Sequence, residues 1–395
     1  MIKKEEGSYS ISTSFFTFAK NLLRINKNKM KKFRFLIIVL VLVIASCSSS
    51  DDGTGTVDNF DRKAMLENLA DNIIIPAYQK FSTDLAALKT ATSNFVSTTD
   101  EANLVSLRQA WSTAYISWQS VSMFEIGKAE ELLYRDFLNV YPVDITNIEA
   151  NISTGTYDLS SVSLQDEQGF GALDYLLNGL SDSDASTVGF YTNPTSGSNY
   201  ENYLVDVVDR ISNLTSEVVG DWTGNYRDTF VNNSGSSATS SLDKLVNDFI
   251  FHYEKHLRAG KIGIPAGVFS GNPLDDRVEA LYKKDLSKTL FNANLSALQD
   301  FFNGKHFNGS VNGESLKTYL DNRDNKELAV MINNQFNLSR TAAAGLNDDF
   351  SEQVRTNNNL MLETYNELQK NVVFLKVDML SVISVNVDFV DADGD

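Results

Sequence analysis

Apolar residues recur every three or four positions along most of the chain after residue 58, and polar residues fill the positions between them. This period places the apolar side chains on one face of an α-helix, where they can pack against a core. In the first such stretch, residues 58–95, the stripe consists of Ile74, Tyr78, Phe81, Leu85 and Leu88. The same period predicts helices over residues 101–121, 123–139, from about 168, 199–220, 240–259, 275–303, 314–322, 325–344 and 349–380.

The segments between these stretches lack the helical period. Residues 140–165 are expected to form a loop that contains a little helix, and residues 181–198 are polar and irregular. In the tail, residues 381–395, alternating Val and Ile are compatible with a short extended segment. No stretch indicates a large sheet, so we predict an all-α fold of two packed antiparallel helical bundles. The predicted halves span about residues 58–198 and 199–390.

Composition supports this fold class and narrows the partners. The 395 residues suffice for roughly two domains, and only 5 of them are proline, which favours helices. The net charge is −17, and the part after residue 46 holds 25 basic and 49 acidic residues. This acidic balance excludes nucleic-acid binding through a basic face. It suits cations or basic partners without identifying one.

The N-terminal region carries the clearest targeting signal. Residues 30–46 begin with three basic residues, continue with the apolar run Phe35–Ala45 and end in small residues. This arrangement is typical of a signal peptide, and the apolar run is too short to span a bilayer. With Cys47 it resembles a bacterial lipobox, which implies lipidation of Cys47 and anchoring to the outer membrane, at the cell surface or on the periplasmic face. The alternative is an ordinary signal peptide or anchor with an incidental cysteine.

Two short segments flank this signal. Residues 1–29 precede the better start at Met30 and are interpreted as a mis-called extension, or alternatively as a genuine extended n-region. Residues 47–57 are a flexible polar tether rich in Ser, Asp and Gly. Because Cys47 is the only cysteine, the chain has no internal disulfide and no Cys-rich zinc or haem-attachment motif.

Two histidines and one aromatic stripe are candidates for chemistry. His252 and His256 are four residues apart, so they share a helix face and could chelate iron or another divalent metal. The pair is not an HExxH motif, and a catalytic zinc generally needs three protein ligands. A solvated or hydrogen-bonded pair is the favoured interpretation. The stripe of Trp111, Tyr115 and Trp118 could cover a flat ligand, but core packing is the commoner use of such a pattern.

The segment "KIGIPAGVFSGNP", residues 261–273, predicts a shaped loop at the end of a helix. Gly residues suit the cap and turn, and Pro265 and Gly267 together stiffen and shape the loop. Such a loop either lines a site or only connects the two halves. Glu279 follows it at the start of the next predicted helix.

Four segments together resemble the imelysin family, also classed as M75 peptidases. They are "WSTAYISWQSVSMFEIG" (111–127), "GFGALDYLLNG" (169–179), "KHLRAGKIGIPAGVFSGNPLDDRVEALY" (255–282) and "DADGD" (391–395). The resemblance covers about residues 60–395. It implies an all-helical, two-bundle fold at the bacterial cell surface or in the periplasm, an association with iron uptake, and peptidase activity in some members.

One family motif is altered in this chain. In the G-x-H-x-x-E motif of the family, His and Glu are three residues apart and could share a cation or a water on one helix face. Here the motif glycine is Gly169, the His position holds Gly171, and the Glu position holds Asp174. The imidazole is absent and the carboxylate is one methylene shorter. Asp174 either retains a ligand-binding role or is a hydrogen-bonded residue near a helix start.

These observations favour a non-catalytic, imelysin-like lipoprotein that binds a ligand connected with iron or haem acquisition. One alternative is an M75-type metallopeptidase in which His252 and His256 join Asp174 around a metal. Another is a scaffold that binds an envelope protein. The candidate ligand residues are Gly169, Gly171, Asp174, Pro265, Gly267 and Glu279.

Overall fold

The apolar stripes form helices in the computed structural model, which describes residues 58–389. The predicted extension, signal peptide, lipidation site at Cys47, tether and acidic "DADGD" segment lie outside the described residues. Within them there is no strand, and one isolated antiparallel bridge joins Lys305 to Asn312. The prediction of an all-α fold is confirmed.

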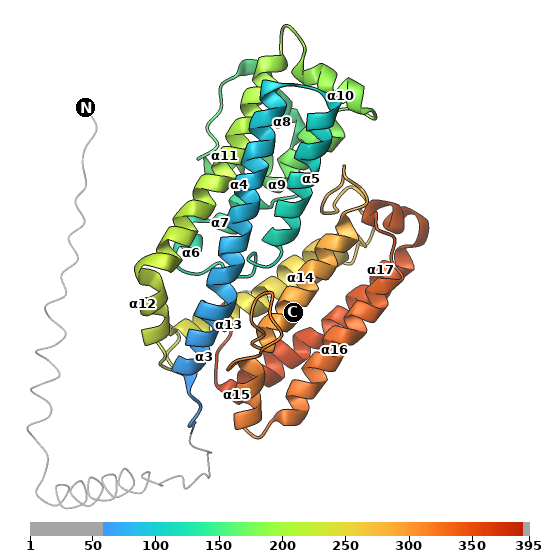
Figure 1. Ribbon diagram of the computed structural model, residues 1–395. Coiled ribbons are helices and arrows are strands. Elements are labelled where there is room, and N and C mark those ends of the chain that lie inside the picture. Colours follow the sequence, from blue (N-terminus) through green and yellow to red (C-terminus); the bar gives the residue numbers. More distant parts are fainter. Residues whose placement is uncertain (1–57, 390–395) are drawn as a thin grey trace, which may run out of the picture. The chain divides into compact units, whose positions relative to one another are not determined.

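One group of helices is arranged around α4 (Ile75–Ser97), which packs lengthwise against α5 (Glu101–Trp118) and α11 (Gly197–Asp221) (Figure 1). The α4 helix continues α3 (Arg62–Leu69) through a π-helical turn, η1 (Ala70–Ile74). The other elements between α5 and α11 are short: α6 (Lys128–Leu132), α7 (Tyr134–Leu138), α8 (Ile145–Thr154), η2 (Val162–Glu167), α9 (Gly169–Asp174), η3 (Tyr175–Gly179) and α10 (Asp184–Tyr191).

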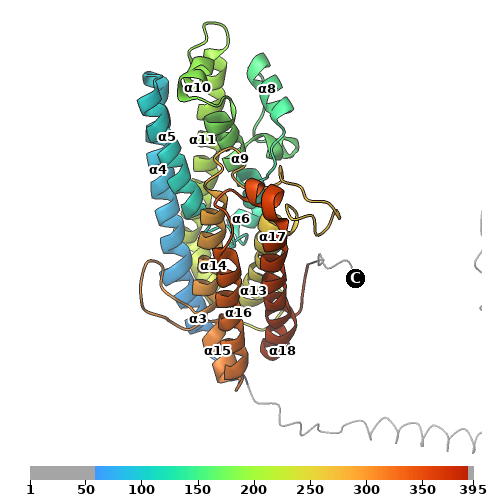
Figure 2. The same cartoon turned by 90° about the vertical axis from the view of Figure 1, so that its right-hand side faces the viewer.

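A second group contains α13 (Ser241–Phe251), α14 (Ser287–Phe302), α16 (Lys326–Ala344) and α17 (Phe350–Val372). The α13 helix continues directly into the π-helical segment η5 (His252–Gly263), which packs against α17 and α14. Figures 1 and 2 show these helices beside the α4 group, and α14 contacts α5. The remaining elements are η4 (Trp222–Tyr226), α12 (Arg227–Asn232), α15 (Leu316–Asn322), η6 (Val373–Met379) and α18 (Leu380–Ile383).

Aromatic residues form much of the core between α4, α5 and α9. Trp111, Tyr115 and Trp118 are all fully buried. The Phe170 ring stacks on the Tyr115 ring with centroids 4.4 Å apart, and Trp118 packs against Phe81 of α4 at 5.7 Å. The aromatic stripe is therefore core, as its spacing indicated.

Three predicted elements differ from the structure for backbone reasons. The expected helix over residues 123–139 is divided into α6 and α7. Gly127 (φ 61°) has a non-helical conformation just before α6, and Leu133 (φ 52°) has a left-handed conformation that separates α6 from α7. The helix expected over 275–303 begins only at Ser287, since Ala280 and Lys284 are also left-handed. The irregular segment 181–198 contains α10, whose first turn is capped by the Ser183 side chain.

Among residues 58–389, none of the helices combines the length and apolar character that a membrane crossing requires.

Candidate functional site

The α9 helix begins with two glycines that lie against the end of α7 and the segment that follows it. Gly169 has φ 74°, and a Cβ added there would lie 2.3 Å from the Leu138 carbonyl oxygen. A Cβ at Gly171 would lie 2.8 Å from Val143 Cγ1 and 2.9 Å from the Val140 carbonyl oxygen. Nonbonded carbon atoms normally approach to about 3.5–4.0 Å. The space that a histidine at position 171 would need is thus filled by residues 140–143.

Asp174, at the end of α9, holds the segment that follows the 261–273 loop. Its carboxylate is buried and accepts hydrogen bonds from the backbone N–H groups of Tyr282 (2.8 Å) and Lys283 (2.9 Å). The Asn178 side-chain amide donates a third at 3.1 Å. Burial raises the pKa of Asp174 to about 7, although these hydrogen bonds oppose the shift. Both carboxylate oxygens are therefore already engaged in joining α9 to residues 282–283.

Glu279 forms a second buried polar contact close by in the chain. It accepts a hydrogen bond from the Lys261 ammonium of η5, and both side chains are buried. The amides of Asn139 (2.8 Å) and Gln119 (3.3 Å) also donate to Glu279. Burial lowers the pKa of Lys261, and the Glu279 carboxylate opposes that shift. This cluster connects η5 to the C-terminal ends of α5 and α7.

His252 and His256 lie together on η5, with nearly parallel rings whose centroids are 5.2 Å apart. The Nε2 atom of His252 lies 3.1 Å from Asn294 Oδ1, whereas its Nδ1 atom is buried without a hydrogen-bond partner. The Nε2 atom of His256 lies 3.4 Å from Arg135 Nη1. Burial lowers the pKa of both histidines well below its usual value, and the nearby Arg135 charge adds to the effect. Both rings are consequently neutral at pH 7, and His256 can accept from Arg135.

The structure brings the two histidines together but does not combine them with Asp174 in a metal site. Residues 58–389 contain no group of three or more His, Cys, Asp or Glu residues placed to hold a metal ion. Asp174 contacts residues 282–283, whereas the histidines contact Asn294 and Arg135. The Arg135 guanidinium beside His256 also repels a bound cation. The residues present therefore do not fit the metal centre considered from the sequence.

Beside His256 is a cavity of about 360 Å³, here named the His256 pocket. Its wall includes three cationic side chains, Arg135, Lys255 and Arg277. Among the described residues that line this pocket, Asp136 is the one with a carboxylate. The segment Asn139–Pro142 forms another part of the wall, and its Val140 carbonyl is the group that lies against Gly171. The segment that closes the family's imidazole position therefore also lines a pocket whose wall holds three cationic side chains and one carboxylate.

The loop after η5 is a tight turn in which Pro265 and Gly267 are buried. Gly267 has φ 80°, and a Cβ there would lie 2.3 Å from the Asn272 carbonyl oxygen. The buried Pro265 accepts a backbone hydrogen bond from Leu274 at 2.8 Å. Pro265 and Gly267 thus shape the turn, while its neighbour Ile264 lines the His256 pocket.

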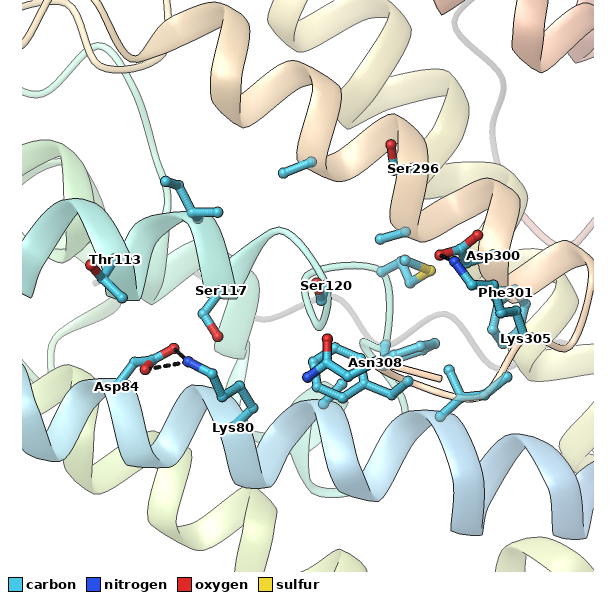
Figure 3. Close-up of a pocket in the computed structure, with 18 residues that line it drawn as sticks. Lys80, Asp84, Thr113, Ser117, Ser120, Ser296, Asp300, Phe301, Lys305 and Asn308 are labelled. Atoms are coloured by element: carbon cyan, nitrogen blue, oxygen red, sulfur yellow. Dashed lines mark hydrogen bonds and ion pairs between the residues drawn. The ribbon is translucent and has the colours of Figure 1, made fainter. Parts of the chain in front are cut away.

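A larger cavity of about 430 Å³ lies between α4, α5 and α14 (Figure 3). Its lining is largely apolar and includes Phe124 and Phe301. The labelled charged residues form two ion pairs: Lys80 lies 2.5 Å from Asp84, and Lys305 lies 2.8 Å from Asp300. Because each lysine is paired with an aspartate, this cavity offers little net charge to a ligand.

Sequence reasoning missed the cationic residues of the His256 pocket. Lys255 and Arg277 lie inside the segment that resembles the imelysin family, but nothing in their spacing distinguished them from solvated charges. Arg135 lies far from η5 in the sequence, so its position 3.4 Å from His256 depends on the packing of α7 against η5. Lys261 was visible in the "KIGIP" motif, yet its pairing with Glu279 required the loop geometry.

The fold and this site define a class of all-helical proteins in which two groups of helices enclose a buried polar cluster. The family model described as imelysin, peptidase M75, matches residues 74–372. The chain therefore belongs to the imelysin family. Among curated proteins, none matches it.

Two solved structures show the same fold at low sequence identity. An imelysin-like protein from Psychrobacter arcticum 273-4 is 17% identical, with a TM-score of 0.65, over 83% of this chain and 97% of that one. A "putative iron-regulated protein A precursor" from Parabacteroides distasonis ATCC 8503 is 18% identical, with a TM-score of 0.65, over 80% of this chain and 94% of that one.

Proposed function

We propose that this protein is a lipid-anchored binding protein of the cell envelope that serves iron or haem acquisition without peptidase catalysis. The observation that carries the proposal is the filled space at Gly171, where a Cβ would lie 2.9 Å from the Val140 carbonyl oxygen. A metallopeptidase needs protein ligands for a metal and a base for water. Here the imidazole position is closed, and Asp174 is bound to backbone N–H groups.

The link to iron is supported by family membership and by the name of one structural neighbour, an iron-regulated protein precursor. The lipobox-like sequence ending at Cys47 supports the envelope location. Lipid chains on one cysteine would hold the protein at a membrane surface. The His256 pocket is the proposed ligand site, because it is a cavity with charged side chains next to the altered motif.

Calorimetric titration of the purified chain with ferric complexes and with haem tests this function. Saturable binding of at least one of them, together with no chelator-sensitive cleavage of a protein substrate, is the expected result. The matched control is the Asp174→Asn variant, which should also bind, because Asp174 is assigned a structural contact and not a metal. Stoichiometric metal with proteolysis that Asp174→Asn abolishes would establish the peptidase instead.

The anchor is tested separately by fractionation of cells that express the full chain. The wild type should sediment with the outer membrane, and the Cys47→Ser variant should not carry lipid. Metabolic labelling with a fatty acid checks this directly. Labelling of the Cys47→Ser variant would show that the attachment does not use this residue.

A further inference from the structure

We propose that the ligand of the His256 pocket is an anion with an aromatic or otherwise flat apolar body. This inference rests on the proposed function, and it specifies that iron arrives as an anionic complex and not as a bare ion. The anionic group would lie against the cationic wall. The apolar body would lie on a neighbouring surface, named here the loop patch, which consists of Ile264, Val268 and Phe269.

Arg135 is one of the three cations that line the pocket, and it is only 6% exposed. Its Nη2 atom donates to Asp248 at 2.8 Å and its Nε atom donates to the Ser122 carbonyl at 2.8 Å. Its Nη1 atom faces the neutral His256 at 3.4 Å, a long contact. A guanidinium offers five N–H donors, so this side of Arg135 can still serve an oxygen anion.

Two further cations line the pocket, and each forms a long ion pair with a neighbouring carboxylate. Lys255 lies 3.9 Å from Glu254, and Arg277 lies 3.7 Å from the adjacent Asp276. Both separations exceed that of a hydrogen-bonded ion pair. Asp136 opposes these charges from the pocket lining. Because Arg135 is paired with Asp248, Lys255 and Arg277 against Asp136 leave a small excess of positive charge on the pocket lining, within a chain whose net charge is −17. Such a local reversal of sign attracts an anion.

The loop patch supplies apolar contact and adjoins the pocket through Ile264. Ile264 lines the pocket and is 40% exposed, and Phe269 is 48% exposed. Val268 is held in the turn by a backbone hydrogen bond to Gly263 at 2.9 Å. The Phe269 ring packs edge-on against Tyr365, with centroids 6.2 Å apart. These apolar side chains are thus exposed on an ordered turn, which is a property of binding surfaces.

Together the pocket and the loop patch indicate which chemical class of ligand would fit. A cationic iron complex would be repelled by the pocket, and a small hydrophilic anion would leave the loop patch uncovered. Iron bound by aromatic oxygen donors, as in a catecholate complex, presents both negative charge and flat rings. Rings of this kind also stack favourably on aromatic and guanidinium groups.

The test compares three ferric complexes by calorimetry at low salt: tris-dihydroxybenzoate (anionic, aromatic), citrate (anionic, without rings) and ferrioxamine B (cationic). The expected order of affinity is dihydroxybenzoate, then citrate, then ferrioxamine B, with about tenfold between the first and the last. Equal or tighter binding of ferrioxamine B would overturn the inference and leave the iron function standing. Failure of all ferric complexes and haem would overturn both. Equal binding of metal-free dihydroxybenzoate would keep the anion site and remove the link to iron.

Variants locate the binding on the protein. The Lys255→Glu, Arg277→Glu double variant should weaken ferric dihydroxybenzoate binding by at least about tenfold at low salt, and added salt should shrink that loss. Phe269→Ser should weaken the aromatic complex and leave citrate nearly unchanged. The matched control is the double variant Lys63→Glu, Lys326→Glu, which reverses two exposed charges on α3 and α16 and changes the net charge by the same amount. If the control loses as much affinity as the Lys255→Glu, Arg277→Glu variant, net charge alone explains the loss, and the assignment of the ligand to the His256 pocket is refuted. Thermal unfolding checks that each variant is folded, and the single Arg277→Gln variant replaces any that is not.

Discussion

Restoring the family's histidine by the Gly171→His substitution should destabilise this protein without creating a metal site. The Cβ atom alone would lie 2.8 Å from Val143 Cγ1 and 2.9 Å from the Val140 carbonyl oxygen. Each distance is more than half an ångström below ordinary contact. The ring would have to displace the segment 140–143, which packs between α9 and the His256 pocket. No metal affinity is expected, because both oxygens of Asp174 stay bonded to residues 282–283.

The magnitude follows from two opposing terms. Overpacking of a closed interior costs about 1–3 kcal/mol, and replacing a helical glycine recovers at most about 1 kcal/mol. Gly171→Ala should therefore lower the free energy of unfolding by about 1 kcal/mol. Gly171→His, with a whole ring to place, should lower it by about 3 kcal/mol. Urea unfolding followed by circular dichroism measures both, with the denaturant slope checked for constancy.

Two variants make this measurement specific. Gly189→Ala lies in α10, where an added Cβ meets no atom within 4 Å, so it should be neutral or stabilising. The Gly171→Ala, Val143→Ala double variant removes one of the two close contacts and should recover part of the loss. Gly171→His with a midpoint equal to or above that of the wild type would refute the conclusion that the imidazole position is closed. Stoichiometric zinc binding by Gly171→His would refute the fixed role of Asp174.

Three further predictions concern the buried polar groups. Because burial raises the folded pKa of Asp174 to about 7 from 3.8, the folded state holds a proton that the unfolded state has lost. The free energy of unfolding of the wild type, relative to that of Asp174→Asn, should thus fall between about pH 4 and 7 and level off above that range. Urea titrations at several pH values measure it. A rise over that range would show that the pKa of Asp174 is not raised in the folded state. Lys261→Met or Glu279→Leu alone should lower the free energy of unfolding by about 3–5 kcal/mol, because each single change leaves a buried charge without its partner. The double variant should lose clearly less. Additive losses in a double-mutant cycle would contradict the pairing of the two residues. The double variant His252→Ala, His256→Ala should leave the protein's content of divalent metal unchanged in elemental analysis, because the neutral pair lies beside the Arg135 guanidinium. Loss of a stoichiometric metal in this variant would show that the two histidines do form a metal site.

Much of the fold could be predicted from periodicity. The helices α4, α5, α11, α13, α16 and α17 follow apolar stripes that the sequence shows plainly. The errors arose where the backbone takes left-handed conformations at ordinary residues, as at Leu133 and Ala280. Such conformations have no signature in a single residue type, and they persist only where the surrounding structure holds the backbone. Asp174, for example, holds residues 282–283, close in the chain to Ala280.

The candidate site was only partly predictable for the same reason. Asp174, Glu279 and the two histidines were identified as polar residues among apolar ones. Their partners could not be identified, because Arg135, Lys261 and Asn294 come from elements distant in the chain or from a loop of undetermined shape. A buried polar group must find a partner, but sequence does not reveal which one.

The sequence by itself determined the helical class, the aromatic core of α5, the absence of an imidazole at position 171 and the lipobox-like segment before Cys47. These depend on residue identity and on spacing along one helix. The tertiary structure alone decided that residues 140–143 fill the vacated space, that Asp174 holds backbone N–H groups, and that Arg135, Lys255 and Arg277 share one pocket. Those facts depend on contacts between segments far apart in the chain, and the free energy of such contacts is set by packing geometry that no local pattern encodes.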